Sequence, residues 1–313
     1  MIGKTQLLLL ITACGSATAF APLTTSVNSQ LNAGRNSFFS AAAKTTSATQ
    51  LNVWSPFKKA EAEPIVIIEE PKEFSPGPFD VKNGAAAATW VALITWAFLF
   101  APGTAGSDAD NALLNTLITQ PTPRPEQINE LWFAVWNAFV VVPATIGALA
   151  APNGKGQRLP AAPFLWGSAF FGFFSLGPYF ATRTDRSNDE AGILRQEDLG
   201  WASKTIFENR IFGAIVAAIA ISIPFSSDIV VSGFDWSAKF ADYLALFESS
   251  RFVAVATVDI AIMSIVSSML VSEDCKMRGE GWNDKSTPLF VATLLLPVLG
   301  PALYLAARPS LEE

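Results

Sequence analysis

Six long apolar stretches, separated by polar connectors, make up most of the chain after residue 84. A helix needs about 20 mainly apolar residues to cross the hydrocarbon core of a bilayer, and most of the stretches come close to that length. The fourth is the shortest and therefore the least complete span. The pattern predicts an all-α integral membrane protein with about six transmembrane helices, at residues 84–101, 131–151, 161–182, 211–225, 252–271 and 288–307.

Two of the connectors between the apolar stretches also have a sequence that predicts their structure. Residues 108–119 begin with a helix-capping pattern and place apolar side chains on one face. They predict either a helix that lies in the membrane interface or a packing helix outside it. The turn at 157–160 is short, so the second and third spans are expected to form a tight antiparallel hairpin.

The chain before the first span has the composition of a two-stage targeting sequence. Lys4, a short apolar run and small residues up to Ala19 are typical of a signal peptide, and the next thirty residues are rich in Ser and Thr without any acid. We interpret 1–19 as a signal peptide, 20–50 as a plastid transit peptide, 51–83 as a flexible polar arm and 84–310 as a six-helix membrane domain. The alternative is a secreted protein with a Ser/Thr-rich start.

The junction between Ala19 and Phe20 resembles the bipartite presequence of nucleus-encoded plastid proteins in diatom-like algae. That resemblance implies a nucleus-encoded protein of a plastid membrane, either the thylakoid or the inner envelope.

The amino-acid composition excludes several kinds of catalytic and cofactor site. Half of the residues are hydrophobic, 15% are charged and there is no histidine, which excludes His-based triads and His-ligated haem. From residue 51 onward, 18 basic residues face 27 acidic ones, a formal charge of −9 that argues against nucleic acid. The expected partners are the lipid bilayer and other plastid membrane proteins. No cofactor or metal is predicted, although a bound carotenoid or lipid would suit the composition.

An internal echo links the third and sixth apolar stretches. Both contain Leu-Gly-Pro, then an aromatic residue, then Arg, and a polar residue precedes each glycine by about forty positions. The echo predicts two inverted three-helix repeats of the kind found in transporters, unless it reflects the general abundance of Gly-Pro in membrane helices. The corresponding residues are Asn137, Gly177, Pro178 and Arg183 in the first half and Asp259, Gly300, Pro301 and Arg308 in the second, with helix kinks expected at the Gly-Pro pairs.

Asp259 is the main candidate for function, because it is the only ionisable residue well inside a predicted span. A central Asp costs about 2.5 to 3.5 kcal/mol on insertion scales, so it needs a partner, a cavity or a proton. The candidate partners are Asn137, Tyr179 and Tyr304. Two interpretations stay open: a proton or ligand site, or a hydrogen bond that only joins two helices.

Charged residues after the fifth span, 273–278, alternate in sign. We interpret them as a solvated helix cap rather than a phosphate or metal site. The acidic connector at 185–198 has no regular ligand spacing, and the chain contains no nucleotide-binding or nucleophile motif.

A series of motifs lies in order between residues 130 and 310: Glu130-Leu131-Trp132-Phe133, Leu176 to Arg183, Glu208-Asn209-Arg210, Ser250-Arg251-Phe252, Asp259, Asp274, Arg278, Leu296-Pro297, Gly300-Pro301, Tyr304 and Arg308-Pro309. Through these motifs the chain resembles an uncharacterised family of cyanobacterial and chloroplast polytopic membrane proteins, which implies a plastid membrane and no established activity. A looser likeness, in the fifth and sixth spans, is to the plant membrane protein required for neoxanthin formation. The His that family members carry after Ser-Arg-Phe is replaced here by Val253 or Ala254, so a metal or pigment role of that His does not carry over.

Two functions follow as expectations. The first is a non-enzymatic plastid membrane protein: an assembly factor, a pigment- or lipid-associated protein, or a small-solute carrier. The alternative is a membrane enzyme of xanthophyll metabolism, in which Asp259 would act as acid or base on a carotenoid epoxide.

Overall fold

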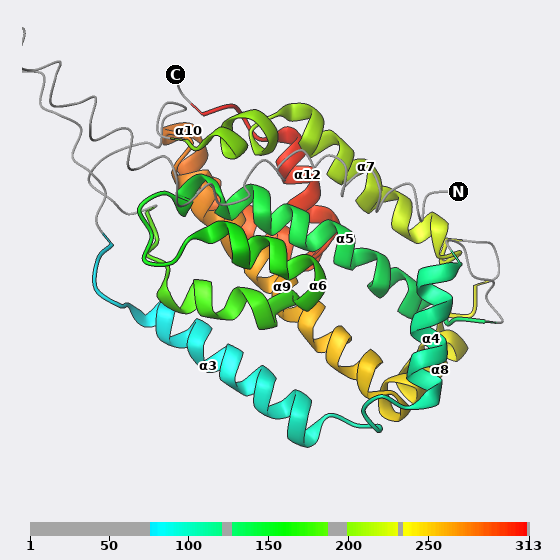
Figure 1. The fold of residues 1–313 in the computed structure, drawn as a ribbon. Coiled ribbons are helices and arrows are strands. Elements are labelled where there is room, and N and C mark those ends of the chain that lie inside the picture. Colours follow the sequence, from blue (N-terminus) through cyan, green and yellow to red (C-terminus); the bar gives the residue numbers. More distant parts are fainter. Residues whose placement is uncertain (1–75, 121–126, 187–198, 231–233, 312–313) are drawn as a thin grey trace, which may run out of the picture. The chain divides into compact units, whose positions relative to one another are not determined.

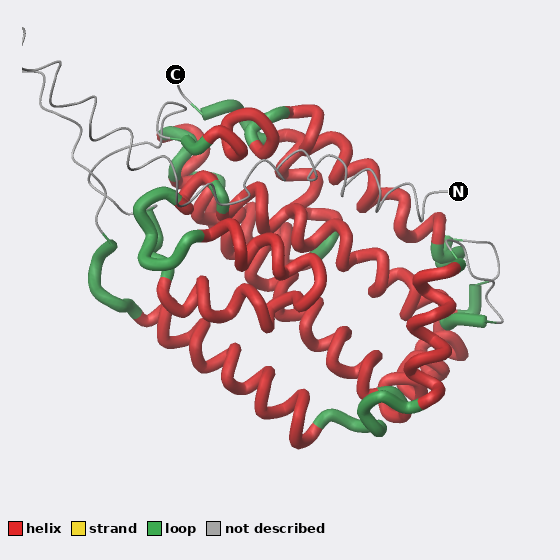
Figure 2. Tube along the Cα trace, in the orientation of Figure 1, coloured by secondary structure: helices red, strands yellow, loops and turns green. Residues whose placement is uncertain are grey.

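The structure is a computed structural model that describes residues 76–120, 127–186, 199–230 and 234–311. The predicted signal peptide, transit peptide and nearly all of the polar arm lie outside these residues. Every regular element of the described part is a helix (Figure 2). The main helices are α3 (Val81–Thr95, extended by the π turn Trp96–Phe100), α4 (Asp108–Thr119), α5 (Glu130–Ala150), α6 (Ala161–Thr182), α7 (Arg210–Ser226), α8 (Trp236–Ser249), α9 (Arg251–Lys276), α10 (Glu280–Asn283), α11 (Ser286–Leu295) and α12 (Leu299–Ala307).

Three helices of the described part are long and apolar enough to cross a membrane: Val81–Phe100, Glu130–Ala150 and Arg251–Lys276. The fourth apolar helix, α7, is shorter. The prediction of an all-α protein with membrane-spanning helices is therefore confirmed in its coarse form. The third and sixth predicted spans differ from the expectation, because each is built from two short helical arms.

Helix α6 folds back on itself in the middle. Gly172 has φ 52° and ψ −133°, values outside any helix. Beyond this break the second arm returns along the first, since the rings of Phe164 and Tyr179 stack with centroids 6.1 Å apart and the Ser175 hydroxyl donates to the Phe164 carbonyl at 3.1 Å. In a straight helix, residues 15 positions apart would be separated by about 22 Å. The run 161–182 is thus a hairpin with its tip at Gly172.

The sixth predicted span forms a second hairpin. Helix α11 ends at Leu295, the chain turns at 296–298, and α12 begins at Leu299. A Cβ atom on Gly300 would lie 2.8 Å from the Thr293 Cα, so the two arms touch where the glycine has no side chain. Each hairpin arm has about ten residues and is about 15 Å long, half of the roughly 30 Å hydrocarbon core.

The chain does not bend at the two Gly-Pro pairs, although helix kinks were expected there. Gly177 and Pro178 belong to the helical second arm of α6, five residues beyond the break at Gly172. Gly300 and Pro301 lie in the first turn of α12, just after the break at 296–298. Gly177 serves packing instead, because a Cβ there would lie 2.1 Å from the indole ring of Trp90 on α3.

Long helices hold the two hairpins in place (Figure 1). Helices α5 and α9 pack against each other in the core, α3 packs along α6, and α7 packs along α12. A buried apolar cluster between them includes Ile146, Leu149, Leu176, Met263 and Leu270. Inside a bilayer, close van der Waals packing of such side chains holds the helices together.

Helices α4 and α8 lie together at one end of the bundle (Figure 1), called here the α4–α8 end. Leu117 of α4 joins a buried cluster with Trp132, Tyr243 and Val253, and the Asp110 carboxylate accepts a hydrogen bond from Ser250, the N-cap of α9. Of the two interpretations of 108–119, the packing helix agrees with these contacts.

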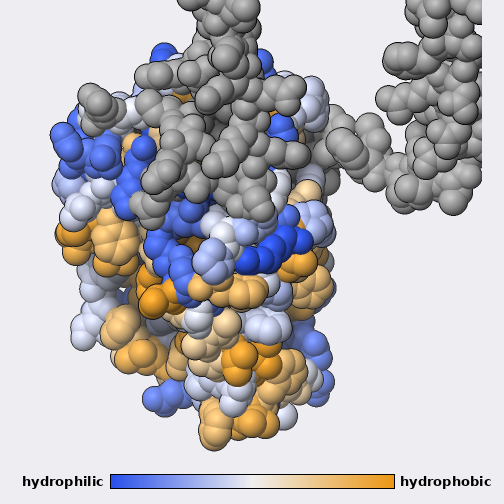
Figure 3. All heavy atoms as spheres, turned by 90° about the vertical axis from the view of Figure 1, so that its left-hand side faces the viewer, coloured by the Kyte–Doolittle hydropathy of each residue, from blue (hydrophilic) through white to orange (hydrophobic). Residues whose placement is uncertain are grey.

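The opposite end carries most of the buried charges and is called here the ionic end. It holds the start of α3, the end of α9 and both ends of the α6 hairpin. Figure 3 views this side of the molecule, where hydrophilic residues gather across the middle and hydrophobic residues lie below them. Its defining residues are Lys82, Arg183, Glu208, Glu273, Asp274, Arg278 and Arg308.

Candidate functional site

The first candidate site is the contact between Asp259 and the tip of the α6 hairpin. Asp259 lies on α9, eight residues or about 12 Å beyond Arg251, and is 4% exposed. Its Oδ1 accepts a hydrogen bond of 2.7 Å from the backbone N–H of Phe173, the first residue after the Gly172 break. A backbone donor from another helix therefore pairs with one oxygen of this buried carboxylate.

Helix physics explains why the hairpin needs this carboxylate. The arm 173–182 begins a new helix, whose first N–H groups have no partner within the helix and carry a partial positive charge. A side-chain oxygen normally caps such groups from the preceding residue. Here that residue is Gly172, which has no side chain, so Asp259 supplies the cap from α9.

Gly172 is required by space as well as by conformation. A Cβ atom at this position would lie 1.6 Å from Oδ2 of Asp259, closer than any non-bonded contact allows. The positive φ of Gly172 also lies in the region that L side chains rarely adopt. The absence of a side chain at Gly172 therefore leaves the space that the Asp259 carboxylate occupies.

None of the three predicted partners bonds Asp259, so that expectation is wrong. The Asn137 amide donates to the Phe133 carbonyl of its own helix at 2.7 Å. Tyr304 donates to Asp274 at 2.6 Å, and the Tyr179 hydroxyl bonds no described residue. The true partner, a main-chain N–H, exists only because α6 is broken, and the one sign of that break in the sequence is a glycine between paired phenylalanines.

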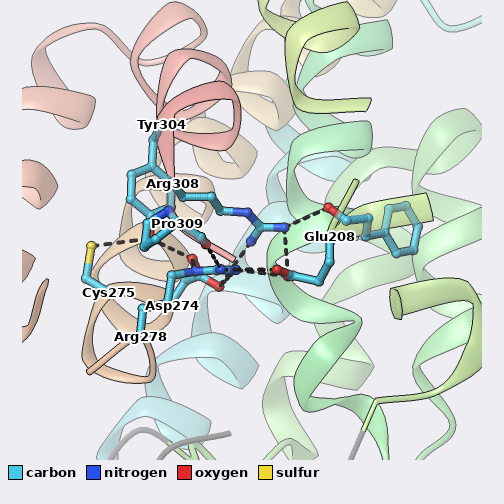
Figure 4. A network of polar contacts seen from close by, with 8 residues as sticks. Glu208, Asp274, Cys275, Arg278, Tyr304, Arg308 and Pro309 are labelled. Atoms are coloured by element: carbon cyan, nitrogen blue, oxygen red, sulfur yellow. Dashed lines mark hydrogen bonds and ion pairs between the residues drawn. The ribbon is translucent and has the colours of Figure 1, made fainter. Parts of the chain in front are cut away.

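A buried ionic network at the ionic end is the second candidate site (Figure 4). Asp274 accepts from Arg278 at 2.6 and 3.0 Å, from Arg308 at 3.1 Å and from the Tyr304 hydroxyl at 2.6 Å. Glu208 bridges the same two arginines from the segment before α7, at 2.9 Å to each. The network joins three segments that lie far apart in the sequence.

The network is closed and electrically balanced, with two carboxylates facing two guanidinium groups. Asp274 is 1% exposed and Arg278 is 6% exposed. Burial alone would lower the pKa of the Arg278 guanidinium, but the Asp274 and Glu208 carboxylates outweigh burial and raise that pKa above its usual value. Arg278 therefore stays charged, and the group acts as a fixed structural clamp.

The interpretation of 273–278 as a solvated helix cap is wrong. Glu273, Asp274, Cys275 and Arg278 are all buried, because their partners come from other parts of the chain and cover them. The thiol of Cys275 even donates to the Tyr304 hydroxyl at 3.4 Å. Alternating signs along a helix end do not reveal whether distant residues will pair with them.

The neighbouring Glu273 builds a similar contact for the first hairpin. Its carboxylate binds the Arg183 guanidinium at 2.7 Å and the Lys82 amine at 3.3 Å, and Lys82 also pairs with Asp185. Arg183 and Arg308 are the two arginines of the internal echo. Each follows a hairpin, and the two bind adjacent carboxylates at the end of α9.

Within the described residues, no group of three or more Cys, Asp or Glu side chains is arranged to hold a metal ion. Most of the acidic connector at 185–198 lies outside those residues. Comparison with known proteins finds no matching family model, no similar curated protein and no similar solved structure. The functional argument therefore rests on the geometry of the two sites.

Proposed function

We propose that the protein is a carrier of a small solute or proton in a plastid membrane. The observation that carries the proposal is Asp259 at the tip of a broken helical hairpin, about 12 Å from one end of α9. Broken helices near the middle of a membrane place main-chain groups and half-helix ends where a solute can reach them. A carboxylate among them is the group suited to hold a proton or a cation.

The proposal includes a topology. Helices α3, α5, α7 and α9 cross the membrane, and the two hairpins enter and leave from the ionic end. Each half of the chain then runs as two crossings followed by a hairpin, with a short helix at the α4–α8 end. Because each half has an even number of crossings, the halves are oriented alike, in place of the inverted repeat that six straight spans would give.

Three contacts support this topology. Asn83 at the start of α3 donates to the carbonyls of Phe180 and Arg183 at the end of α6. A Cβ on Gly103, shortly after α3, would lie 2.5 Å from the backbone nitrogen of Arg251 at the start of α9. Helices α3 and α9 therefore begin at opposite ends.

Proton flux in proteoliposomes tests the function. The full chain is reconstituted with a pH-sensitive dye inside, and an electrical potential is imposed across the membrane. Asp259→Asn keeps an oxygen to accept from Phe173 N–H, so the variant is expected to fold and accumulate normally while losing the titratable group. We expect flux through the wild type and at least a tenfold loss in Asp259→Asn.

The matched control is Asp242→Asn, which removes an exposed carboxylate on α8 and should leave the flux unchanged. Equal flux in wild type and Asp259→Asn would reject the proton site and leave Asp259 as a helix cap only. An altered pigment profile in a knockout that lacks any flux defect would favour the xanthophyll enzyme instead.

A further inference from the structure

Five buried polar atoms at the ionic end have no hydrogen-bond partner among the described residues. They are Nδ2 and Oδ1 of Asn153, Oη of Tyr179, Nε of Arg183 and Oγ1 of Thr184. Asn153 and Tyr179 are 0% exposed and Arg183 is 7% exposed. Native proteins rarely leave buried polar groups unpaired, so a group of five requires an explanation.

These atoms belong to neighbouring residues. Asn153 lies in the turn between α5 and α6, and a Cβ on the next residue, Gly154, would be 4.0 Å from the Tyr179 hydroxyl. Arg183 follows Tyr179 by one helical turn, and its charge acts on the Tyr179 oxygen. Gln157 ties the same turn to Thr184 through two hydrogen bonds of 2.8 Å.

The unpaired atoms are mainly donors. The Asn153 amide, the Tyr179 hydroxyl and the Arg183 Nε–H all have a hydrogen to give. Arg183 is held in place because its Nη2 already binds Glu273 at 2.7 Å, which leaves Nε free for another acceptor. Around the cluster, the three cations Lys82, Arg158 and Arg183 face the three carboxylates Asp80, Asp185 and Glu273, so the surrounding charge is balanced.

We propose that Asn153, Tyr179 and Arg183 bind a phosphate-type oxyanion. The three donors, one of which is the Nε–H of a buried guanidinium, match the acceptor oxygens of such a group. The site lies where α6 ends and α3 begins, which in the topology proposed above is the level of the phosphates of surrounding lipids. Its ligand is therefore the phosphate of an anionic lipid or free inorganic phosphate, and the inference does not depend on the carrier function.

Thermal stability of the full-length protein in nanodiscs distinguishes the two sources. One arm adds inorganic phosphate to nanodiscs of phosphatidylcholine, and the other replaces part of that lipid with phosphatidylglycerol. We expect one of the two additions to raise the unfolding temperature. If both leave it unchanged, the proposal is wrong.

Tyr179→Phe and the control Tyr243→Phe make the test specific. The Tyr179 hydroxyl has Arg183 as its polar neighbour but forms no hydrogen bond of normal geometry with a described residue, so its removal should lower stability without ligand only slightly and weaken ligand binding about tenfold or more. The Tyr243 hydroxyl pairs with Thr257 at 2.8 Å, so its removal should lower stability and leave binding intact. Unchanged binding by Tyr179→Phe, or ordered waters alone at the three side chains in a phosphate-saturated structure, would overturn the site.

Discussion

Asp274→Asn perturbs the buried ionic network with almost no change in shape. The wild-type carboxylate accepts four hydrogen bonds, three from the guanidinium groups of Arg278 and Arg308 and one from the Tyr304 hydroxyl. An amide in the same place offers one oxygen, and its NH₂ group would face donors. The variant also leaves two buried arginines opposite a single carboxylate, Glu208.

The size of the effect follows from burial. Removing one partner of a buried ion pair costs about 3 to 5 kcal/mol, because the remaining charge is left uncompensated. For a domain of the length of residues 76–311, that corresponds to a fall of about 6 to 20 °C in unfolding temperature. Asp284→Asn is the matched control, since Asp284 is exposed near the same end and its charge should contribute about 1 kcal/mol or less.

Both variants are measured by thermal unfolding of the detergent-solubilised protein, followed by the loss of its monodisperse peak in size-exclusion chromatography. We expect the Asp274 variant to lose its peak well below the wild type and the Asp284 variant to follow the wild type. If the two variants unfold within about 2 °C of each other, the network does not stabilise the fold and its description as a clamp is wrong.

Three further predictions concern the hairpin, the topology and processing. Gly172→Ala should destabilise the protein by more than about 3 kcal/mol and sharply reduce accumulation, because the new Cβ would collide with the Asp259 carboxylate. The control is Gly84→Ala on α3, where a Cβ would have no neighbouring atom within 4 Å, and this variant should be neutral or mildly stabilising. Single cysteines at Lys155 and Lys204, introduced into a background that carries Cys14→Ser and Cys275→Ser, should react with a membrane-impermeant thiol reagent from the same side. Labelling from opposite sides would mean that α6 crosses the membrane. N-terminal sequencing of protein from isolated plastids should find a start between about 45 and 60, and recovery of intact Met1 would contradict the predicted presequence.

The hydrophobic pattern located the helices well but could not reveal the hairpins. Residues 161–182 form one apolar run in which no polar residue marks a turn, so length alone predicted a crossing helix. Gly172 signals the fold-back only when its positive φ is known. The run 288–307 has the same ambiguity, because the 296–298 turn is itself apolar.

The candidate sites were predictable in part. Asp259 stood out because an ionisable residue inside an apolar stretch is costly, and the structure places it at a hairpin tip. The ionic network did not stand out, since Glu208 and Arg308 lie 70 and 30 residues from Arg278 and only the fold brings them together. The internal echo identified Arg183 and Arg308 but gave no sign of the carboxylates that they bind.

Helix α9 holds the first hairpin at two points. Asp259 binds its tip and Glu273 binds the arginine at its base, and the two carboxylates are 14 residues or about 21 Å apart along the helix axis. The next residue, Asp274, holds the arginine behind the second hairpin. Adjacent residues of a helix point about 100° apart, so a rotation or slide of α9 would pull on both hairpins at once. The two hairpins are therefore mechanically coupled through this one helix.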